Sequence, residues 1–174
     1  MSTPSAKIMV AVAEQSAWIQ ISGRANFTAS VDFKTLVAEL HRTGHQRFEL
    51  DLTECVLMDS TFLGVLAGFG IRFGAARGGD ATVTFELVNP NARVTELLAS
   101  LGVAHLFKLS QHAPTAPAVA VVEAVITTTP PAETLARTCL EAHQTLMEIE
   151  PKNIPKFKDV AQFFAEDLKK LQGG

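Results

Sequence analysis

The chain has 174 residues, the length of one ordinary domain, which excludes a large multidomain enzyme. Apolar residues make up 47% and charged residues 19%, so the chain is expected to fold as a globular protein rather than to be disordered. The formal net charge is −3, and this mildly acidic balance disfavours nucleic acid as a partner.

The longest apolar run is too short to span a membrane as a helix. It extends from Phe62 to Ile71, about half of the roughly twenty residues that a bilayer requires. The first residues lack the apolar region of a secretion signal. We therefore expect a cytoplasmic protein without direct membrane insertion. Cys55 and Cys139 lie far apart in apolar segments, which favours two buried free thiols.

Hydrophobic periodicity predicts strands that alternate with helices over the first 110 residues. In chain order, the predicted elements are a β-hairpin at 8–13 and 18–22, a loop at 23–26, a helix from Ser30 to the stop at Gly44, a strand at 48–52, a segment 55–58 that leads into a turn at 59–61, a helix at 62–76, a strand at 82–88, a helical stripe at 94–101 and a short strand at 105–109.

The helix expected at 62–76 contains four glycines, Gly64, Gly68, Gly70 and Gly74. Each costs an isolated helix up to about 1 kcal/mol relative to alanine, so a compensating contact is expected. A glycine allows another backbone to approach closely. We therefore expect this helix to pack tightly against a sheet.

The pattern changes after residue 110. Residues 119–128 are β-branched and predict an edge strand or a short helix, and two amphipathic helices follow. We predict an α/β domain of α+β, sandwich-like character at 1–110, with a mixed sheet of about five strands and helices packed on it. Residues 111–131 are predicted as a linker or edge strand, and residues 132–174 as a C-terminal helical hairpin.

The sequence lacks the usual motifs of nucleotide, metal and hydrolase sites. No phosphate-loop pattern occurs, and Gly68–Phe73 has Phe in place of the third glycine of a dinucleotide fingerprint. His41 and His45 have no third ligand nearby in the sequence. No Gly-x-Ser-x-Gly surrounds Ser60. We therefore expect no cofactor, no metal, no catalytic residues and no enzyme activity.

The segment Met58–Thr61 stands at a strand-to-helix turn and carries the most informative side chains. An oxygen of Asp59 or Ser60 is suited to cap the following helix. Ser60 is also a phosphorylation candidate, because free N–H groups and the helix dipole at this end tolerate a phosphate. The two interpretations are compatible.

Residues 48–66, which contain the Asp59-Ser60-Thr61 motif, resemble the signature of STAS domains of the anti-sigma factor antagonist type. Residues 19–24 resemble the second strand and following loop of that family, and residues 87–107 resemble its last strand-helix-strand unit. The resemblance covers roughly residues 7–110 and implies the STAS fold.

The resemblance implies partner switching in transcription regulation and signal transduction, with Ser60 phosphorylated and Thr61 as a secondary acceptor. It implies a protein partner, an anti-sigma factor or a serine-kinase-like protein. The partner-binding residues expected on this basis are Gly23, Arg24, Asn26, Asp59, Ser60, Thr61 and Phe62. Phe62 stands where the family usually has glycine, so we expect it to reshape the docking surface.

Two alternative functions remain open: a constitutive STAS subunit of a lipid-transport ABC system, and a small serine hydrolase that uses Ser60. The helical tail has two interpretations as well. It packs on its own domain, as most amphipathic helices do, or it forms a second docking surface or homodimer contact. We expect the first interpretation; adjacent Phe163 and Phe164, which widen the apolar stripe of the last helix, are the reason for considering the second.

Overall fold

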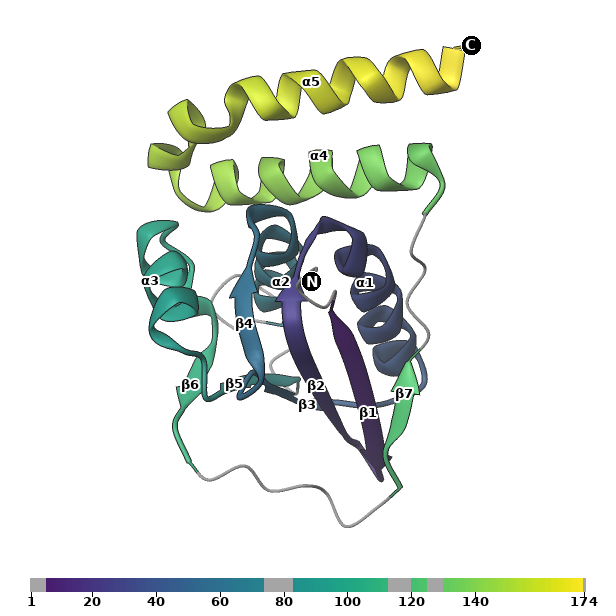
Figure 1. Cartoon of the computed structure of the whole chain (residues 1–174), viewed down its shortest axis with the longest axis vertical. Coiled ribbons are helices and arrows are strands. Elements are labelled where there is room, and N and C mark those ends of the chain that lie inside the picture. The colour runs from purple at the N-terminus through teal and green to yellow at the C-terminus, as the bar shows by residue number, and fades with distance from the viewer. Residues whose placement is uncertain (1–5, 74–82, 113–119, 125–129, 174) are drawn as a thin grey trace, which may run out of the picture.

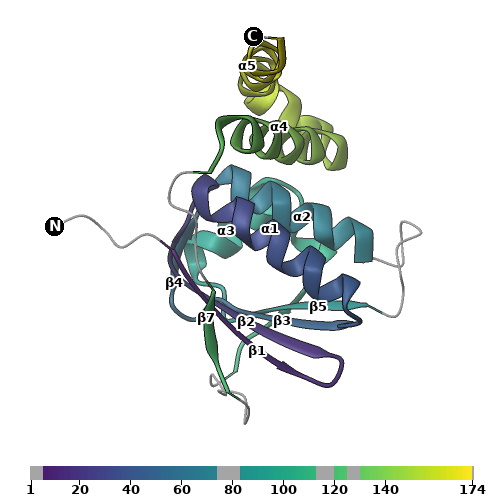
Figure 2. The ribbon, with the colours of Figure 1, turned by 90° about the vertical axis from the view of Figure 1, so that its right-hand side faces the viewer.

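The computed structural model describes residues 6–73, 83–112, 120–124 and 130–173, which form three layers (Figures 1 and 2). A β-sheet forms the first layer, helices α1, α2 and α3 the second, and a hairpin of α4 and α5 the third. The elements are β1 Lys7–Ala13, β2 Ser16–Ala25, α1 Phe27–Arg42, β3 Arg47–Asp51, β4 Cys55–Met58, α2 Ser60–Phe73, β5 Thr84–Val88, α3 Ala92–Ser100, a 3₁₀ turn Ala104–Leu106, β6 Lys108–Ser110, β7 Val122–Ala124, α4 Ala132–Ile149, a 3₁₀ turn Pro151–Asn153 and α5 Ile154–Gly173.

The sheet is mixed, which confirms the predicted α/β class with the STAS arrangement. Its order is β6-β5-β3-β2-β1-β7, and β4 pairs with the end of β2. Strands β1 and β2 form the predicted antiparallel hairpin, whereas β2, β3, β5 and β6 run parallel. The described residues contribute seven strands rather than about five, because the short segments β4 and β7 also pair. β7 pairs antiparallel to β1, so residues 119–128 contain an edge strand.

Several predicted boundaries were wrong for identifiable reasons. Residues 23–25 belong to β2 rather than to a loop, since β4 pairs with them past an irregularity between Gly23 and Arg24. Helix α1 begins before Ser30 because the Asn26 side chain accepts the Ala29 N–H. Helix α2 begins at Ser60 rather than at residue 62, and its predicted end at 76 lies outside the described residues.

The strand predicted at 105–109 is in fact a 3₁₀ turn followed by a shorter strand. Residues 104–106 form the 3₁₀ turn and only Lys108–Ser110 pair as β6. The segment 55–58, predicted only as a lead-in to the turn, is itself the strand β4. Both errors concern segments of three or four residues, which are too short for periodicity to define.

The main core lies between the sheet and α1 and α2. Phe62 is fully buried, and its ring stacks on that of Phe33 with the centroids 4.8 Å apart. Phe33 also meets Phe69 edge to face at 6.1 Å. Both cysteines are free and buried, as predicted. Phe62 thus joins α1 to α2 inside the domain.

The hairpin lies on α1 and α2, with α5 outermost (Figure 2). A Cβ placed on Gly64 would lie 2.4 Å from the backbone oxygen of Ala142 in α4. The close backbone approach expected of the glycine-rich helix is therefore made to α4, and at this position the expectation of a sheet as partner was wrong. None of the helices within the described residues is long and apolar enough to cross a membrane.

We predict that Phe62→Ala lowers the free energy of unfolding by about 3–5 kcal/mol, because it removes a fully buried ring. Val56→Ala is the control, since Val56 is 47% exposed and its loss should change stability by no more than about 1 kcal/mol. Urea unfolding followed by circular dichroism measures both. Equal effects of the two substitutions would contradict this packing.

Candidate functional site

The Asp59 carboxylate joins the N-termini of two helices. Its Oδ1 accepts the N–H of Phe62 at 2.8 Å, which caps α2, and its Oδ2 accepts the N–H of Phe27 at 2.6 Å, in the first turn of α1. Both bonds satisfy N–H groups that lack a partner within their own helix. The capping role predicted for this turn thus belongs to Asp59.

The Ser60 side chain points toward the C-terminal hairpin. Its Oγ lies 2.9 Å from Nε2 of His143 in α4, 83 residues away in the sequence. Nδ1 of His143 lies 2.7 Å from the Cys139 carbonyl oxygen, a group that can only accept. In the neutral imidazole Nδ1 therefore carries the proton, and Nε2 accepts the hydrogen that Ser60 donates.

His143 is enclosed on its other sides by α5. The imidazole is 3% exposed, and its centroid lies 5.0 Å from the ring of Phe157 and 6.4 Å from that of Phe164. Next to this contact, the Thr61 hydroxyl lies 3.8 Å from the Cys139 sulfur. The start of α2 is thus covered by α4, which α5 covers in turn.

Burial affects the ionisation of the groups at this contact. Desolvation raises the pKa of the Asp59 carboxyl, although the N–H groups of Phe62 and Phe27 oppose the shift. Desolvation also raises the pKa of the Cys139 thiol, in spite of its contact with Thr61. A further negative charge at this position would therefore be poorly solvated.

The remaining residues expected to bind a partner occupy different environments. Arg24 is exposed, and Gly23, with φ of 81°, stands at the irregularity in β2. Asn26 caps α1. Thr61 is 5% exposed and Phe62 is fully buried, so in this conformation neither presents a side chain at the surface.

Sequence reasoning did not connect His143 with this site. The hydroxyl-to-imidazole distance is that of a nucleophile and a general base. The nearby pocket of about 150 Å³ between α1, α2 and α4, however, includes neither Ser60 nor His143 among its lining residues. The group at Nδ1 is a backbone carbonyl rather than a carboxylate. The contact is a hydrogen bond between two packed helices.

Comparison with known families shows what this domain is. The family model described as "Mlab, STAS domain" matches residues 8–110, which is more than half of the chain. The chain belongs to this STAS-domain family. The match ends before the hairpin of α4 and α5. A search of curated proteins found no match.

Solved structures similar to this chain include a putative anti-sigma factor antagonist (tm1081) from Thermotoga maritima, at 21% identity over 58% of this chain and 83% of that chain, with a TM-score of 0.48. The anti-sigma factor antagonist SpoIIAA in its unphosphorylated form is 15% identical over 61% of this chain and 88% of its own, with a TM-score of 0.49. SpoIIAA of Bacillus in its phosphorylated form is 15% identical over 62% and 91%, with a TM-score of 0.48.

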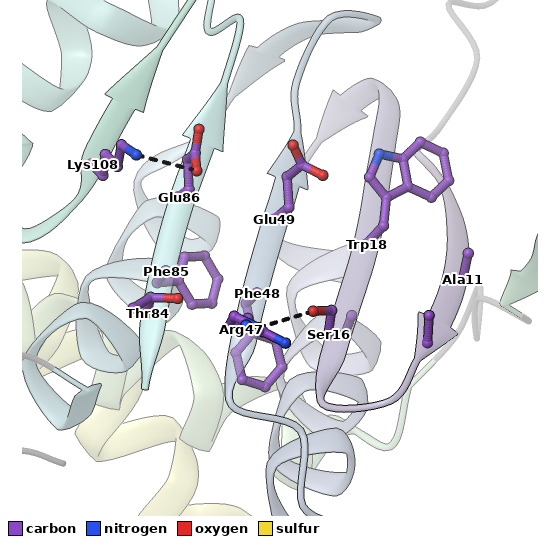
Figure 3. A pocket seen from close by; sticks show the side chains of 12 residues that line it. Ala11, Ser16, Trp18, Arg47, Phe48, Glu49, Thr84, Phe85, Glu86 and Lys108 are labelled. Atoms are coloured by element: carbon purple, nitrogen blue, oxygen red, sulfur yellow. Dashed lines mark hydrogen bonds and ion pairs between the residues drawn. The ribbon is translucent and has the colours of Figure 1, made fainter. Parts of the chain in front are cut away.

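The opposite face of the STAS sheet has a second concave region. A pocket of about 440 Å³ lies over β2, β3 and β5, where no helix of the described residues covers the sheet (Figures 2 and 3). Trp18, Glu49 and Glu86 project from neighbouring strands at this pocket. It lies on the side of the sheet remote from Ser60.

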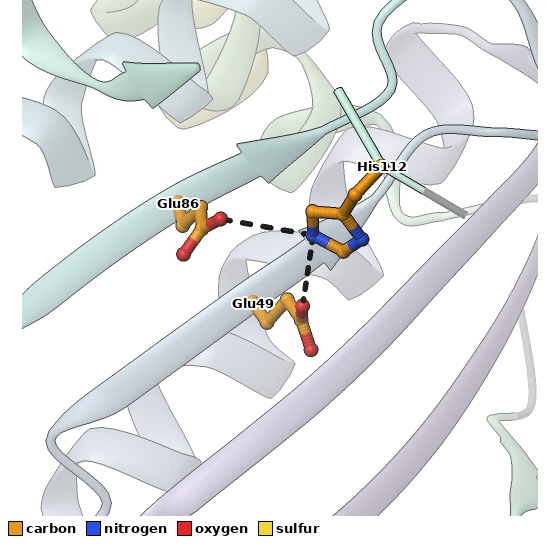
Figure 4. A group of neighbouring side chains, drawn as sticks. All are labelled: Glu49, Glu86 and His112. Carbon is orange, nitrogen blue, oxygen red and sulfur yellow. Dashed lines mark ion pairs between the residues drawn. The ribbon is translucent and has the colours of Figure 1, made fainter. Parts of the chain in front are cut away.

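Two carboxylates and a histidine meet beside this pocket. Glu49 and Glu86 are directly paired on β3 and β5, and Nε2 of His112 lies 4.0 Å from one oxygen of each (Figure 4). Their ligand atoms lie within 4.8 Å of one another, so the three residues have donors that a divalent metal can use. Lys108 also lies 3.9 Å from Glu86. Lys108 therefore already provides countercharge to the acidic pair.

Burial, followed by the charge of Glu86, raises the pKa of the Glu49 carboxyl, and His112 opposes the shift. A raised carboxyl pKa means that the folded chain keeps its proton to a higher pH than the unfolded chain, so ionisation of Glu49 costs stability. We predict that the stability of Glu49→Gln, relative to wild type, rises as the pH increases from about 4 through the raised pKa of Glu49 in the folded chain, and is constant above it.

Urea midpoints measured at several pH values provide the test. Glu54→Gln is the control, because Glu54 is an exposed residue of the loop between β3 and β4. If the difference between Glu49→Gln and wild type does not change with pH, ionisation of Glu49 carries no cost in the fold.

Proposed function

We propose that this STAS protein is a non-catalytic regulator of the anti-sigma factor antagonist kind, which acts in the cytoplasm and changes partners when Ser60 is phosphorylated. The partner is a protein, an anti-sigma factor or a serine-kinase-like protein. The surface proposed to bind it comprises Gly23, Arg24, Asn26, Asp59, Ser60 and Thr61, with Phe62 buried beneath it and shaping it from inside, and Thr61 is the secondary phosphate acceptor.

One observation carries the proposal: among the described residues, the Ser60 hydroxyl is hydrogen-bonded to the C-terminal hairpin and not to the STAS domain. Asp59 supplies the cap of α2 and the bond to α1. Ser60 Oγ has its contact with His143, which lies outside the residues that match the family. A modification of this oxygen therefore leaves the cap and the domain core in place.

The change in charge is large enough to act as a switch. A phosphate adds about −1.5 to −2 charges, next to the carboxylate of Asp59. Two like charges about 4 Å apart cost about 4 kcal/mol at a surface-type dielectric before screening. Since about 1.4 kcal/mol is a factor of ten in affinity, even a screened fraction releases a transient partner.

The Ser60–His143 bond favours a second candidate function. A serine that is held in a hydrogen bond with its own chain can be structural, as in a constitutive STAS subunit of a lipid-transport ABC system. Such a subunit would copurify with a membrane ATPase, and substitution of Ser60 would not change its partners.

Pull-downs from a lysate of the source cells test the switch with four forms of the full chain. We expect wild type and Ser60→Ala to retrieve the same partner and Ser60→Glu to lose it at least tenfold. Ser100→Glu is the matched control, because it adds the same charge at an exposed site on α3. Mass spectrometry after incubation with lysate and ATP should find phosphate on Ser60. If all four forms retrieve the same proteins, the switch is wrong.

We also propose a homodimer contact on the outer face of α5. Phe163 is 62% exposed there and Leu171 is 41% exposed, whereas the neighbouring Phe164 turns inward toward His143. Light scattering of the full chain should give the mass of two chains, and Phe163→Glu should give the mass of one. A monomeric wild type at the same concentration would contradict the dimer.

A further inference from the structure

Part of the surface that the proposed function assigns to a partner, the start of α2, is covered by the chain's own C-terminal hairpin. Helix α4 lies along α2, with His143 on Ser60, Cys139 on Thr61 and the backbone of Ala142 over Gly64. Figure 2 shows the hairpin as a separate layer above α1 and α2. The family match ends at residue 110, so the cover is an addition of this chain to its STAS domain.

We propose that the α4–α5 hairpin is an intramolecular gate over Ser60. A kinase and a protein partner reach this surface only when the hairpin has undocked: in the unmodified chain the partner binds and holds the undocked state, and a phosphate on Ser60 both repels the partner and prevents the hairpin from docking again. The inference rests on the proposed function, because it assigns a mode of regulation to the same serine.

Ser60 Oγ lies only 2.9 Å from His143 Nε2, a gap that a single hydrogen fills. Phosphorylation replaces the hydrogen in this gap with a phosphorus atom and three further oxygens. The imidazole has little room to retreat, since its Nδ1 is bonded to the Cys139 carbonyl and Phe157 lies on its far side. The phosphate therefore displaces α4 itself.

Electrostatic repulsion also favours undocking of the hairpin once Ser60 is phosphorylated. Asp59 is already negative beside Ser60, and its two oxygens are occupied by the N–H groups of Phe62 and Phe27. The docked hairpin excludes water from Asp59 and Ser60, which weakens the solvation of any charge added there. Undocking exposes the phosphate to water and relieves its repulsion with Asp59.

The contact between the hairpin and the STAS domain is tight in places and open in others. Ala142 meets Gly64 closely, and Leu146 and Ile149 are buried with the core of the STAS domain, whereas a pocket of about 150 Å³ remains between α1, α2 and α4. At its rim an exposed ion pair joins Lys34 to Glu141 at 2.8 Å. The two helices pack on each other along their length, so they can move as one unit.

The reactivity of two native cysteines, Cys139 and Cys55, measures the undocking of the hairpin. Cys139 is buried between α4 and α2, whereas Cys55 is buried in the STAS core. Burial raises the pKa of Cys55 to about 11 and that of Cys139 as well, so each reacts with a maleimide mainly after exposure. Undocking exposes Cys139 alone, and global unfolding exposes both.

Labelling of the full chain with N-ethylmaleimide, followed by mass spectrometry, tests the gate. We expect Ser60→Glu to label Cys139 roughly tenfold faster than wild type, with Cys55 unchanged. Gly64→Ala should have the same effect, because its Cβ would meet the Ala142 backbone. Gly68→Ala is the matched control: the same substitution on the same helix, where a Cβ meets no atom within 4 Å.

The outcomes separate the gate from the switch. If both Ser60→Glu and Gly64→Ala label Cys139 at the wild-type rate, the gate is wrong. If Ser60→Glu also speeds the labelling of Cys55, that variant is unfolding, and the comparison of Gly64→Ala with Gly68→Ala decides. If the gate opens as expected while the pull-downs with Ser60 variants remain identical, the gate stands and the proposed function fails.

Discussion

Helix α4 can lie on α2 only because residue 64 has no side chain. A Cβ there would come within 2.4 Å of the Ala142 backbone, a distance that real Cβ atoms do not tolerate. This approach fixes the height of α4 above α2 and thereby brings His143 to Ser60 and Cys139 to Thr61. The cost of glycine within a helix, up to about 1 kcal/mol, is offset by the packing of a second helix.

Two adjacent residues at the start of α2, Asp59 and Ser60, have different roles. Asp59 holds the N-termini of α1 and α2 together through two N–H bonds, which makes it part of the fold. Ser60 extends the same turn but directs its hydroxyl outward to the hairpin. Because the structural role and the proposed regulatory role fall on different side chains, a change at Ser60 can alter what covers the domain without melting its helices.

The sheet and the helices could be predicted from periodicity, since β3, β5 and the hairpin of α4 and α5 each repeat their apolar residues regularly. The contact of Ser60 with His143 could not, because it joins residues 83 positions apart through tertiary packing. Two signals pointed toward it. The glycines of α2 indicated a close neighbour, and His143 follows Cys139 by one helical turn on the apolar side of α4. Neither signal shows by itself that α2 and α4 are the helices that contact each other.

The central claim is that α4 rests on α2 at Gly64. It is tested most directly by nuclear Overhauser contacts in the full chain, measured between the methyl protons of Ala142 and the α protons of Gly64. The structure predicts a strong contact, since Ala142 Cβ lies 2.7 Å from the position of a Cβ on Gly64. If Ala142 shows contacts to α5 but none to Gly64, the hairpin does not dock on this face, and its proposed control of Ser60 would be contradicted.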